Sequence, residues 1–127
     1  MKYAVAHPFA LIVRFTVRTG SEATFDELVA ATTASIRAGE PGTLVYACHR
    51  VEGSPRERIF YELYASEGAF RVHENQPHTR HFLAAREPLL ESTVVDFLSL
   101  TDGKTPKLAN SINADFDFGD IIGFGDG

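Results

Sequence analysis

The stretches TLVYACHRV (residues 43–51) and RIFYELYA (residues 58–65) decide the fold of this chain. Both are rich in β-branched and aromatic residues, and the polar segment between them, residues 52–56, holds a glycine and a proline. This pattern predicts two antiparallel strands that form a hairpin. The second strand is apolar on both faces, so we expect both faces of the sheet to be covered. Its apolar residues are Phe60 and Tyr64 on one side and Ile59, Tyr61 and Leu63 on the other.

The segment before the hairpin predicts a strand followed by a helix. In residues 8–18, apolar residues recur at every second position, which is typical of a strand with one buried face. A glycine then breaks the strand, and a helix that ends at Gly39 follows. This helix is expected to start at Ser21 or at Thr24, where Thr24 and Glu27 would form a capping box.

The segment after the hairpin predicts two helices and a fourth strand. Residues 66–73 have the pattern of a short capped helix, and Pro77 fits the first turn of a further helix that extends to about Glu87. Pro88 ends that helix, and residues 89–100 supply the last strand. The order β-α-β-β-α-β is that of a ferredoxin-like α+β fold with an antiparallel sheet.

Helices on one face of such a sheet leave its opposite face apolar and without cover. The economical way to bury that face is contact with a second copy of the chain. The sequence therefore predicts a homodimer.

Length and composition set limits on the class of protein. A chain of 127 residues, 44% of them hydrophobic, can bury one core, and we expect one domain over residues 1–101. Residues 102–127 form an extension with spaced apolar side chains, which we expect to dock on the domain or on the partner subunit. A net charge of −5 argues against a nucleic-acid partner. No stretch predicts a signal peptide or a membrane span, so we expect a cytoplasmic protein with no membrane partner.

A series of short patterns along the chain carries a family resemblance. They are Glu40-Pro41-Gly42, Tyr46, FYELY at residues 60–64, Ala69-Phe70, His73, Pro77-His78 and Phe82. Through them the chain resembles antibiotic-biosynthesis-monooxygenase-like domains, the quinol monooxygenase family, over residues 8–100. The resemblance implies a dimeric α/β barrel in which two sheets face each other, with a pocket in each subunit between sheet and helices. Unlike several members of the family, the chain has no tryptophan.

The resemblance also implies an activity. Members of the family oxidise quinols or polyketide phenols with O2 and without bound flavin or metal, so we expect a cofactor-independent monooxygenase for a small aromatic or quinol substrate. Such a reaction needs a base, a hydrogen-bond donor for the growing oxyanion and a dry pocket. We predict catalytic roles for His73 as base, Tyr64 as hydrogen-bond partner and Glu62 as the group that orients a histidine. The predicted substrate-binding residues are Tyr46, Phe60, Phe70, Phe82 and His78.

Other interpretations of these residues stay open. Structural roles would place His73 at a helix terminus, Glu62 in an ion pair and the tyrosines in the core. His73, His78 and His81 lie within nine residues, but no HExxH or CxxC pattern accompanies them, so no metal and no cofactor is predicted. Two alternative functions are haem binding or degradation, which relatives of the family carry out, and a non-catalytic dimer that binds a small ligand.

Overall fold

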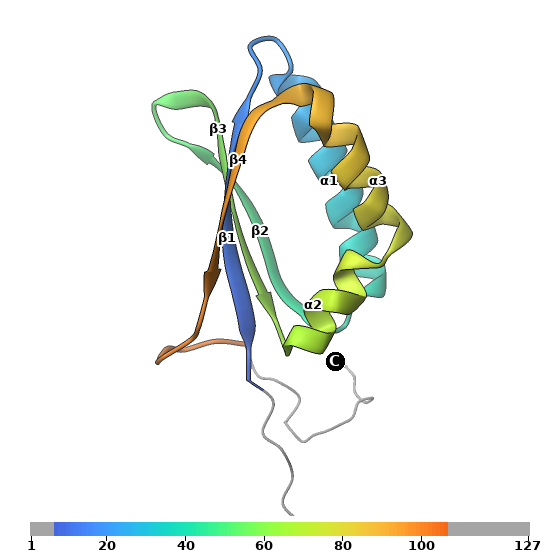
Figure 1. Cartoon of the computed structure of the whole chain (residues 1–127), viewed down its shortest axis with the longest axis vertical. Helices are drawn as coiled ribbons and strands as arrows, with labels where there is room; N and C mark the ends of the chain where they lie inside the picture. The colour runs from blue at the N-terminus through green and yellow to red at the C-terminus, as the bar shows by residue number, and fades with distance from the viewer. Residues whose placement is uncertain (1–6, 107–127) are drawn as a thin grey trace, which may run out of the picture.

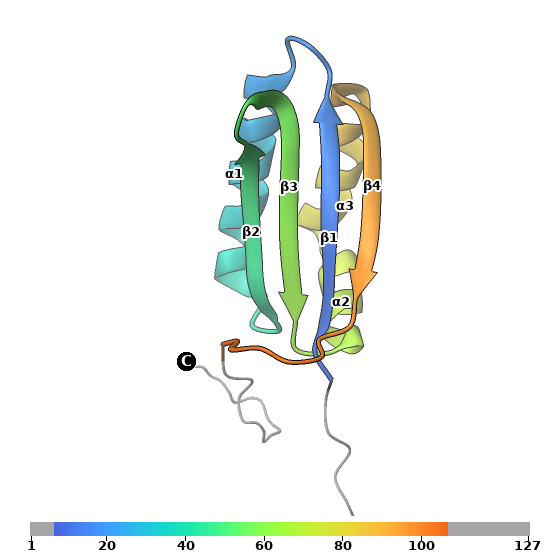
Figure 2. The same cartoon turned by 90° about the vertical axis from the view of Figure 1, so that its left-hand side faces the viewer.

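The computed structural model describes residues 7–106, and its elements follow the predicted order. The four strands form one antiparallel sheet in the order β2-β3-β1-β4 (Figure 2), and the helices cover one face of that sheet (Figure 1). The predicted ferredoxin-like α+β fold is thereby confirmed. The elements are β1 (Phe9–Val17), α1 (Glu22–Gly39), β2 (Thr43–Val51), β3 (Ser54–Tyr64), α2 (Glu67–Glu74), α3 (Pro77–Arg86), the short 3-10 helix η1 (Glu87–Leu89) and β4 (Leu90–Leu98).

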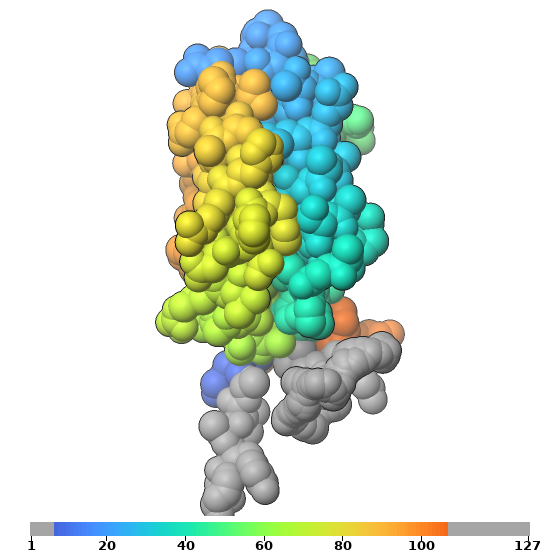
Figure 3. Space-filling view, turned by 90° about the vertical axis from the view of Figure 1, so that its right-hand side faces the viewer, coloured from blue at the N-terminus to red at the C-terminus, as the bar shows by residue number. Residues whose placement is uncertain are grey.

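The core lies between the sheet and the helices, and alternate residues of β1 supply much of it. From Leu11 to Val17, every second side chain is 5% exposed or less, in agreement with the predicted period of two. The Phe15 ring lies 5.4 Å from Phe25 of α1 and 4.8 Å from Phe60 of β3, centroid to centroid. Figure 3 shows α1 and α3 packed side by side over this core.

Two predicted boundaries differ from the structure. Ser21 is the N-cap of α1, and Thr24 lies inside the helix, so the predicted capping box of Thr24 and Glu27 is wrong. The Glu22 carboxylate instead accepts a hydrogen bond of 2.8 Å from the backbone N–H of Gly20. The hairpin turn is also shorter than expected, because β3 already begins at Ser54.

The outer face of the sheet, opposite the helices, carries the residues that alternate with the core positions. Arg14 of β1 and Glu57 of β3 form an ion pair there. Val94 and Leu98 of β4 are 53% and 38% exposed, so part of this face is apolar and open to solvent in a single subunit. On β1, β3 and β4 the face consists of Ala10, Ile12, Arg14, Thr16, Glu57, Ile59, Tyr61, Leu63, Val94, Asp96 and Leu98.

The part of the extension that the structure describes ends at residue 106. Residues 99–106 run across the end of the sheet (Figure 2), and the rest of the extension that we expected to dock, residues 107–127, lies outside the described residues. None of the helices within residues 7–106 has the length and apolar character needed to cross a membrane.

Gly42, in the turn between α1 and β2, tests the contact of this turn with α2. A Cβ atom at this position would lie 2.8 Å from the Cβ of Ala69, closer than side-chain packing tolerates. We expect Gly42→Ala to lower the free energy of unfolding by about 1–3 kcal/mol, as overpacking does. Chemical denaturation followed by circular dichroism measures this change.

Gly39 is the matched control, because a Cβ atom there meets nothing within 4 Å. We expect Gly39→Ala to be neutral or slightly stabilising. Adding Ala69→Gly to Gly42→Ala would relieve the clash and restore stability. Equal losses in the free energy of unfolding from Gly42→Ala and Gly39→Ala would contradict the packing described here.

Candidate functional site

Glu40 is a buried carboxylate at the junction of four elements. It follows the last residue of α1, and its side chain is 2% exposed. Its Oε1 accepts hydrogen bonds from the Thr43 hydroxyl at 2.7 Å and from Nδ1 of His73 at 2.8 Å. Its Oε2 is hydrogen-bonded to Nε2 of His78 at the start of α3. Both oxygen atoms of this carboxylate therefore have hydrogen-bond partners.

These hydrogen bonds determine the charge of Glu40. Burial alone would raise the pKa of the carboxyl group, but the hydrogen bonds from Thr43, His78 and His73 together outweigh burial and lower the pKa below its ordinary value of 4.5. Glu40 is accordingly an ionised carboxylate at neutral pH.

His73 lies in the last turn of α2 and is held by Glu40. Because an ionised carboxylate only accepts hydrogen bonds, the Nδ1 atom that contacts Glu40 must carry a proton. The hydroxyl oxygen of Thr79 lies 3.4 Å from the same nitrogen. In the neutral imidazole, Nε2 is then the nitrogen with a free lone pair. The Glu40 contact thus orients His73 as a base whose accepting nitrogen is Nε2.

The rings around His73 come from the sheet. The centroids of the Tyr46 ring of β2 and the Tyr64 ring of β3 lie 5.6 and 5.3 Å from that of His73. The Tyr46 ring in turn lies 5.7 Å from Phe60. Burial is the largest cause that raises the pKa of Tyr46 well above 10, and the nearby Glu62 adds to it. Tyr46 and Tyr64 are therefore phenols that keep their protons and line an aromatic interior.

Glu62 of β3 is a second buried carboxyl group, and it behaves in the opposite way to Glu40. Tyr64 donates a hydrogen bond of 2.6 Å to its Oε1. Burial, the largest cause, raises the pKa of Glu62, and the Tyr64 hydrogen bond and the charge of His73 oppose this less strongly. Burial and the charge of Glu62 also raise the pKa of Tyr64 above its ordinary value of 10.

The structure brings most of the predicted site residues into one interior region between the sheet and the helices. His73, Tyr64, Glu62 and Tyr46 are direct neighbours, and Phe60 and Phe82 lie next to them with ring centroids 6.2 Å apart. His78 reaches the region only through its hydrogen bond to Glu40.

Phe70 lies at one end of this region. Its ring is 5.3 Å from Tyr64, but it is also 4.9 Å from Phe9 and 6.1 Å from the exposed Phe97. Phe70 therefore connects the interior to the end of the sheet where β1 begins and β4 ends.

One predicted relationship is wrong, and two residues were not predicted. Glu62 does not orient a histidine: its partner is Tyr64, and Glu40 contacts His73 instead. Glu40 appeared in the sequence only as part of a Glu-Pro-Gly pattern, from which its burial cannot be read. Arg86, in the last turn of α3, points into the same layer, with its guanidinium carbon 5.2 Å from the centroid of the Phe15 ring. A basic residue at a helix end is usually solvated, so the sequence did not indicate that Arg86 would lie against the core.

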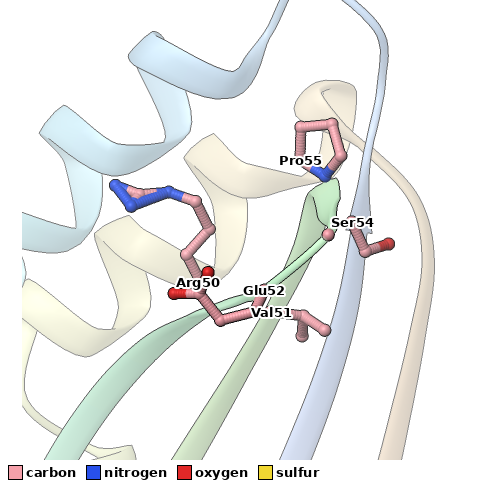
Figure 4. A pocket seen from close by; sticks show the side chains of 6 residues that line it. Arg50, Val51, Glu52, Ser54 and Pro55 are labelled. Carbon is pink, nitrogen blue, oxygen red and sulfur yellow. The ribbon is translucent and has the colours of Figure 1, made fainter.

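The described part of the chain has a surface hollow at each end of the sheet. One, of about 190 Å³, is at the β2–β3 hairpin and is lined by residues 50–55 (Figure 4), at the end of β2 far from Glu40. A second, of about 410 Å³, is lined by residues at the start of β1 and the end of β4, including Phe9 and Phe97, and by Glu67 of α2. Within residues 7–106, no group of three or more His, Cys, Asp or Glu side chains has an arrangement that would hold a metal ion.

Comparison with known proteins assigns the chain to a family. The sequence profile of the antibiotic biosynthesis monooxygenase family matches residues 8–85, which include Glu40, Glu62, Tyr64 and His73. The chain belongs to this family. The resemblance stated from the sequence is thereby confirmed. A comparison with curated proteins finds no match.

Solved structures agree with this assignment. A protein from Mycobacterium tuberculosis is 26% identical, with a TM-score of 0.72 over 77% of this chain and 99% of that one. A protein from Pseudomonas aeruginosa is 24% identical, with a TM-score of 0.72 over 79% of this chain and 100% of that one. A candidate antibiotic biosynthesis monooxygenase from Caulobacter crescentus is 24% identical, with a TM-score of 0.72 over 77% of this chain and 93% of that one. The monooxygenase-family fold of the chain is therefore shared by proteins with divergent sequences.

The opposite pKa shifts of Glu40 and Glu62 predict opposite pH dependences of stability. The lowered pKa of Glu40 stabilises the fold above the unfolded-state pKa, and this contribution is lost as the pH falls through the folded-state pKa. We expect Glu40→Gln to lower the free energy of unfolding by about 3 kcal/mol at neutral pH, because His73 and His78 lose a buried partner. The difference in the free energy of unfolding between Glu40→Gln and the wild type should become smaller at acidic pH.

The raised pKa of Glu62 predicts the opposite change of stability with pH. Its contribution is fully present below the unfolded-state pKa and is lost as the pH rises through the folded-state pKa. The wild type should therefore lose stability relative to Glu62→Gln as the pH rises. Denaturant unfolding across a pH series measures both differences, with the exposed Glu67→Gln as control. Parallel pH profiles for Glu40→Gln and Glu62→Gln would contradict the two charge states.

Proposed function

We propose that this member of the antibiotic biosynthesis monooxygenase family is a cofactor-independent monooxygenase that oxidises a small aromatic or quinol substrate with O2. The observation that carries the proposal is the buried Glu40–His73 pair, in which the carboxylate holds Nδ1 and leaves Nε2 as a base. Base, orienting carboxylate and aromatic walls meet in one interior region, as proton abstraction from a phenol requires.

The proposed reaction starts with transfer of the phenolic proton to Nε2 of His73. The resulting phenolate is electron-rich and passes one electron to O2. The substrate radical and superoxide then combine to form a C–O bond, and the peroxide loses water as its O–O bond breaks. The balance is one phenol and one O2 for one quinone and one water, and the proton held on His73 leaves with the water. No external reductant is needed because the substrate supplies the electrons.

Tyr64 and Tyr46 supply hydrogen-bond donors in this scheme. Their raised pKa values keep both phenols protonated, so that each can donate to an oxyanion of the substrate. Tyr64 already donates to Glu62, and a substrate oxygen would compete with that carboxyl group for the same proton. Phe60 and Phe82, which are 1% and 4% exposed, keep this region apolar.

The activity is tested by oxygen uptake of purified, metal-free protein with a panel of hydroquinones and polyphenols. We expect uptake above the autoxidation rate and, with ¹⁸O₂, one labelled oxygen atom in the product. His73→Asn should lower kcat by roughly a hundredfold, because it removes a general base. Glu40→Gln should lower kcat more than it changes KM, because it acts through the orientation of His73.

His81 provides the control for these variants. It lies on α3, three residues after His78, and is exposed to solvent. His81→Asn should leave oxygen uptake unchanged. A fully active His73→Asn variant, or no uptake above autoxidation with any substrate of the panel, would contradict the proposal.

We also propose that the chain acts as a homodimer that buries the outer face of the sheet. This is supported by the apolar residues that a single subunit leaves exposed there, Val94 and Leu98. Val95 and Phe97 are 42% and 62% exposed on the side of β4 that faces the helices, so this edge strand is open on both faces. Exposed edge strands are common sites of subunit contact.

The dimer is tested by a charge placed on the outer face. Val94→Asp should shift the protein toward the monomer in light scattering and sedimentation, because an unpaired carboxylate would be buried in the contact. Val72→Asp is the control, since Val72 of α2 is 57% exposed and lies on the helix side. A monomeric wild type at micromolar concentration, or an unchanged Val94→Asp dimer, would contradict this interface.

A further inference from the structure

Arg86 is an interior cation that the proposed reaction has not yet used. It ends α3 and is half-buried, and its guanidinium carbon lies 5.2 Å from the centroid of the Phe15 ring and 5.6 Å from that of Phe82. Its Nε is buried and has no hydrogen-bond partner among residues 7–106. Nor does any carboxylate in this part of the chain lie within ion-pair distance of it.

Arg58 shows how the same fold satisfies a buried arginine. It is 5% exposed, and its Nε and one terminal nitrogen bind both oxygens of Asp26 at 2.8 and 3.0 Å. The other terminal nitrogen donates to the carbonyl oxygens of Pro55 and Glu57 at 2.8 and 3.0 Å. A buried donor without a partner is rare because it loses its hydration without replacement. The difference between Arg58 and Arg86 therefore points to a partner of Arg86 outside residues 7–106.

The surroundings of Arg86 select the charge of that partner. Glu62 and Tyr46 of the sheet lie near it, and burial raises the pKa of both groups. Burial, the largest cause, lowers the pKa of Arg86, with Glu87, Tyr46, Glu62 and Glu74 opposing this. The guanidinium is thus a poorly compensated positive charge above two aromatic rings. An anion that brings its own ring would supply both the missing charge and matching apolar contact.

Arg86 and His73 both border the aromatic layer between the sheet and the helices. The two residues lie along one series of neighbouring rings, because Tyr46 is 5.7 Å from Phe60, and Phe60 is 4.8 Å from Phe15, over which Arg86 lies. A substrate deprotonated by His73 becomes an anion, and a fixed cation in a dry interior stabilises that anion more than the neutral substrate.

We propose that Arg86 is the substrate-recognition residue of this site, and that the substrate is a small aromatic molecule with an anionic oxygen, a phenolate, enolate or carboxylate, held by the guanidinium. This inference rests on the proposed function for the identity of the site and adds the charge of its ligand. Arg86 holds the substrate oxygen through its N–H donors, whereas His73 handles the proton. Uncharged aromatic molecules of the same shape are bound less tightly, because a neutral oxygen accepts a weaker hydrogen bond from the guanidinium than an anionic oxygen does.

The test is equilibrium binding in the absence of O2, measured by calorimetry with a matched pair of probes, 2-naphthoate and its neutral isostere 2-naphthamide. We expect the wild type to prefer 2-naphthoate by about tenfold or more, as charge-assisted hydrogen bonds do. Arg86→Met, which keeps the length of the side chain but removes the charge, should abolish this preference and keep the affinity for 2-naphthamide. Arg86→Lys should retain part of it, because an ammonium keeps the charge and loses the planar donors.

Arg80 of α3 is the matched control, because it is exposed and its side chain donates a hydrogen bond to the exposed Asn75. Arg80→Met should keep the preference of the wild type. Circular dichroism of each variant detects loss of fold, and the comparison of the two probes on the wild type needs no variant at all. Equal affinity of the wild type for both probes, no binding of either probe, or an unchanged preference in Arg86→Met would overturn the inference.

The same measurement separates this inference from the proposed reaction. Binding is recorded without O2 and without turnover, so a charge preference that depends on Arg86 stands even where no oxygen uptake is found. Conversely, uptake that depends on His73 but does not change in Arg86→Met would support the reaction and refute the role of Arg86.

Discussion

The buried carboxylate of Glu40 ties together the end of α1, the start of β2 and helices α2 and α3. A carboxylate with 2% of its side chain exposed is tolerated only where donors replace its water, and Thr43, His73 and His78 are those donors. The position of Gly42 serves the same junction, because a larger residue would push Ala69 of α2 away. The orientation of His73 is therefore a consequence of how the helical layer packs on the sheet, and the role that we propose for it depends on that packing.

Two carboxyl groups within this interior have opposite pKa shifts because they differ in donors. Glu40 is surrounded by groups that donate to it and has a lowered pKa, whereas Glu62 has one phenol as its donor and a pKa raised by burial. Such a separation of pKa values is how one site gives two carboxyl groups different roles. Arg86 adds a cation to this interior, and its Nε has no hydrogen-bond partner among the described residues. The interior thus places an imidazole, two phenols and a guanidinium around the aromatic layer, the groups on which the proposed function rests.

The sequence predicts the strands, their order and the residues that face the core, because period-two patterns such as that of β1 report directly on burial. It also predicts that His73, Tyr64 and Tyr46 lie together, since the hairpin and the following helix bring them to one region. It does not predict which acid meets His73. Glu40 follows the last residue of α1, and Glu62 lies within β3. His73 contacts Glu40 because α2 packs against the end of α1, and the sequence pattern does not report that packing. Arg86 is missed for a similar reason, because the direction of a side chain in the last turn of α3 depends on packing and not on pattern.

The central claim is that Glu40 holds the proton of His73 on Nδ1 and leaves Nε2 as the basic nitrogen. Nitrogen-15 NMR of the histidine rings tests it most directly, with the His73 signals assigned from the spectrum of His73→Asn. At a pH where imidazoles are neutral, we expect long-range proton–nitrogen couplings to identify His73 as the tautomer protonated on Nδ1, and Glu40→Gln to weaken that preference. A His73 ring protonated on Nε2, or one whose tautomer does not respond to the loss of the Glu40 charge, would contradict the account.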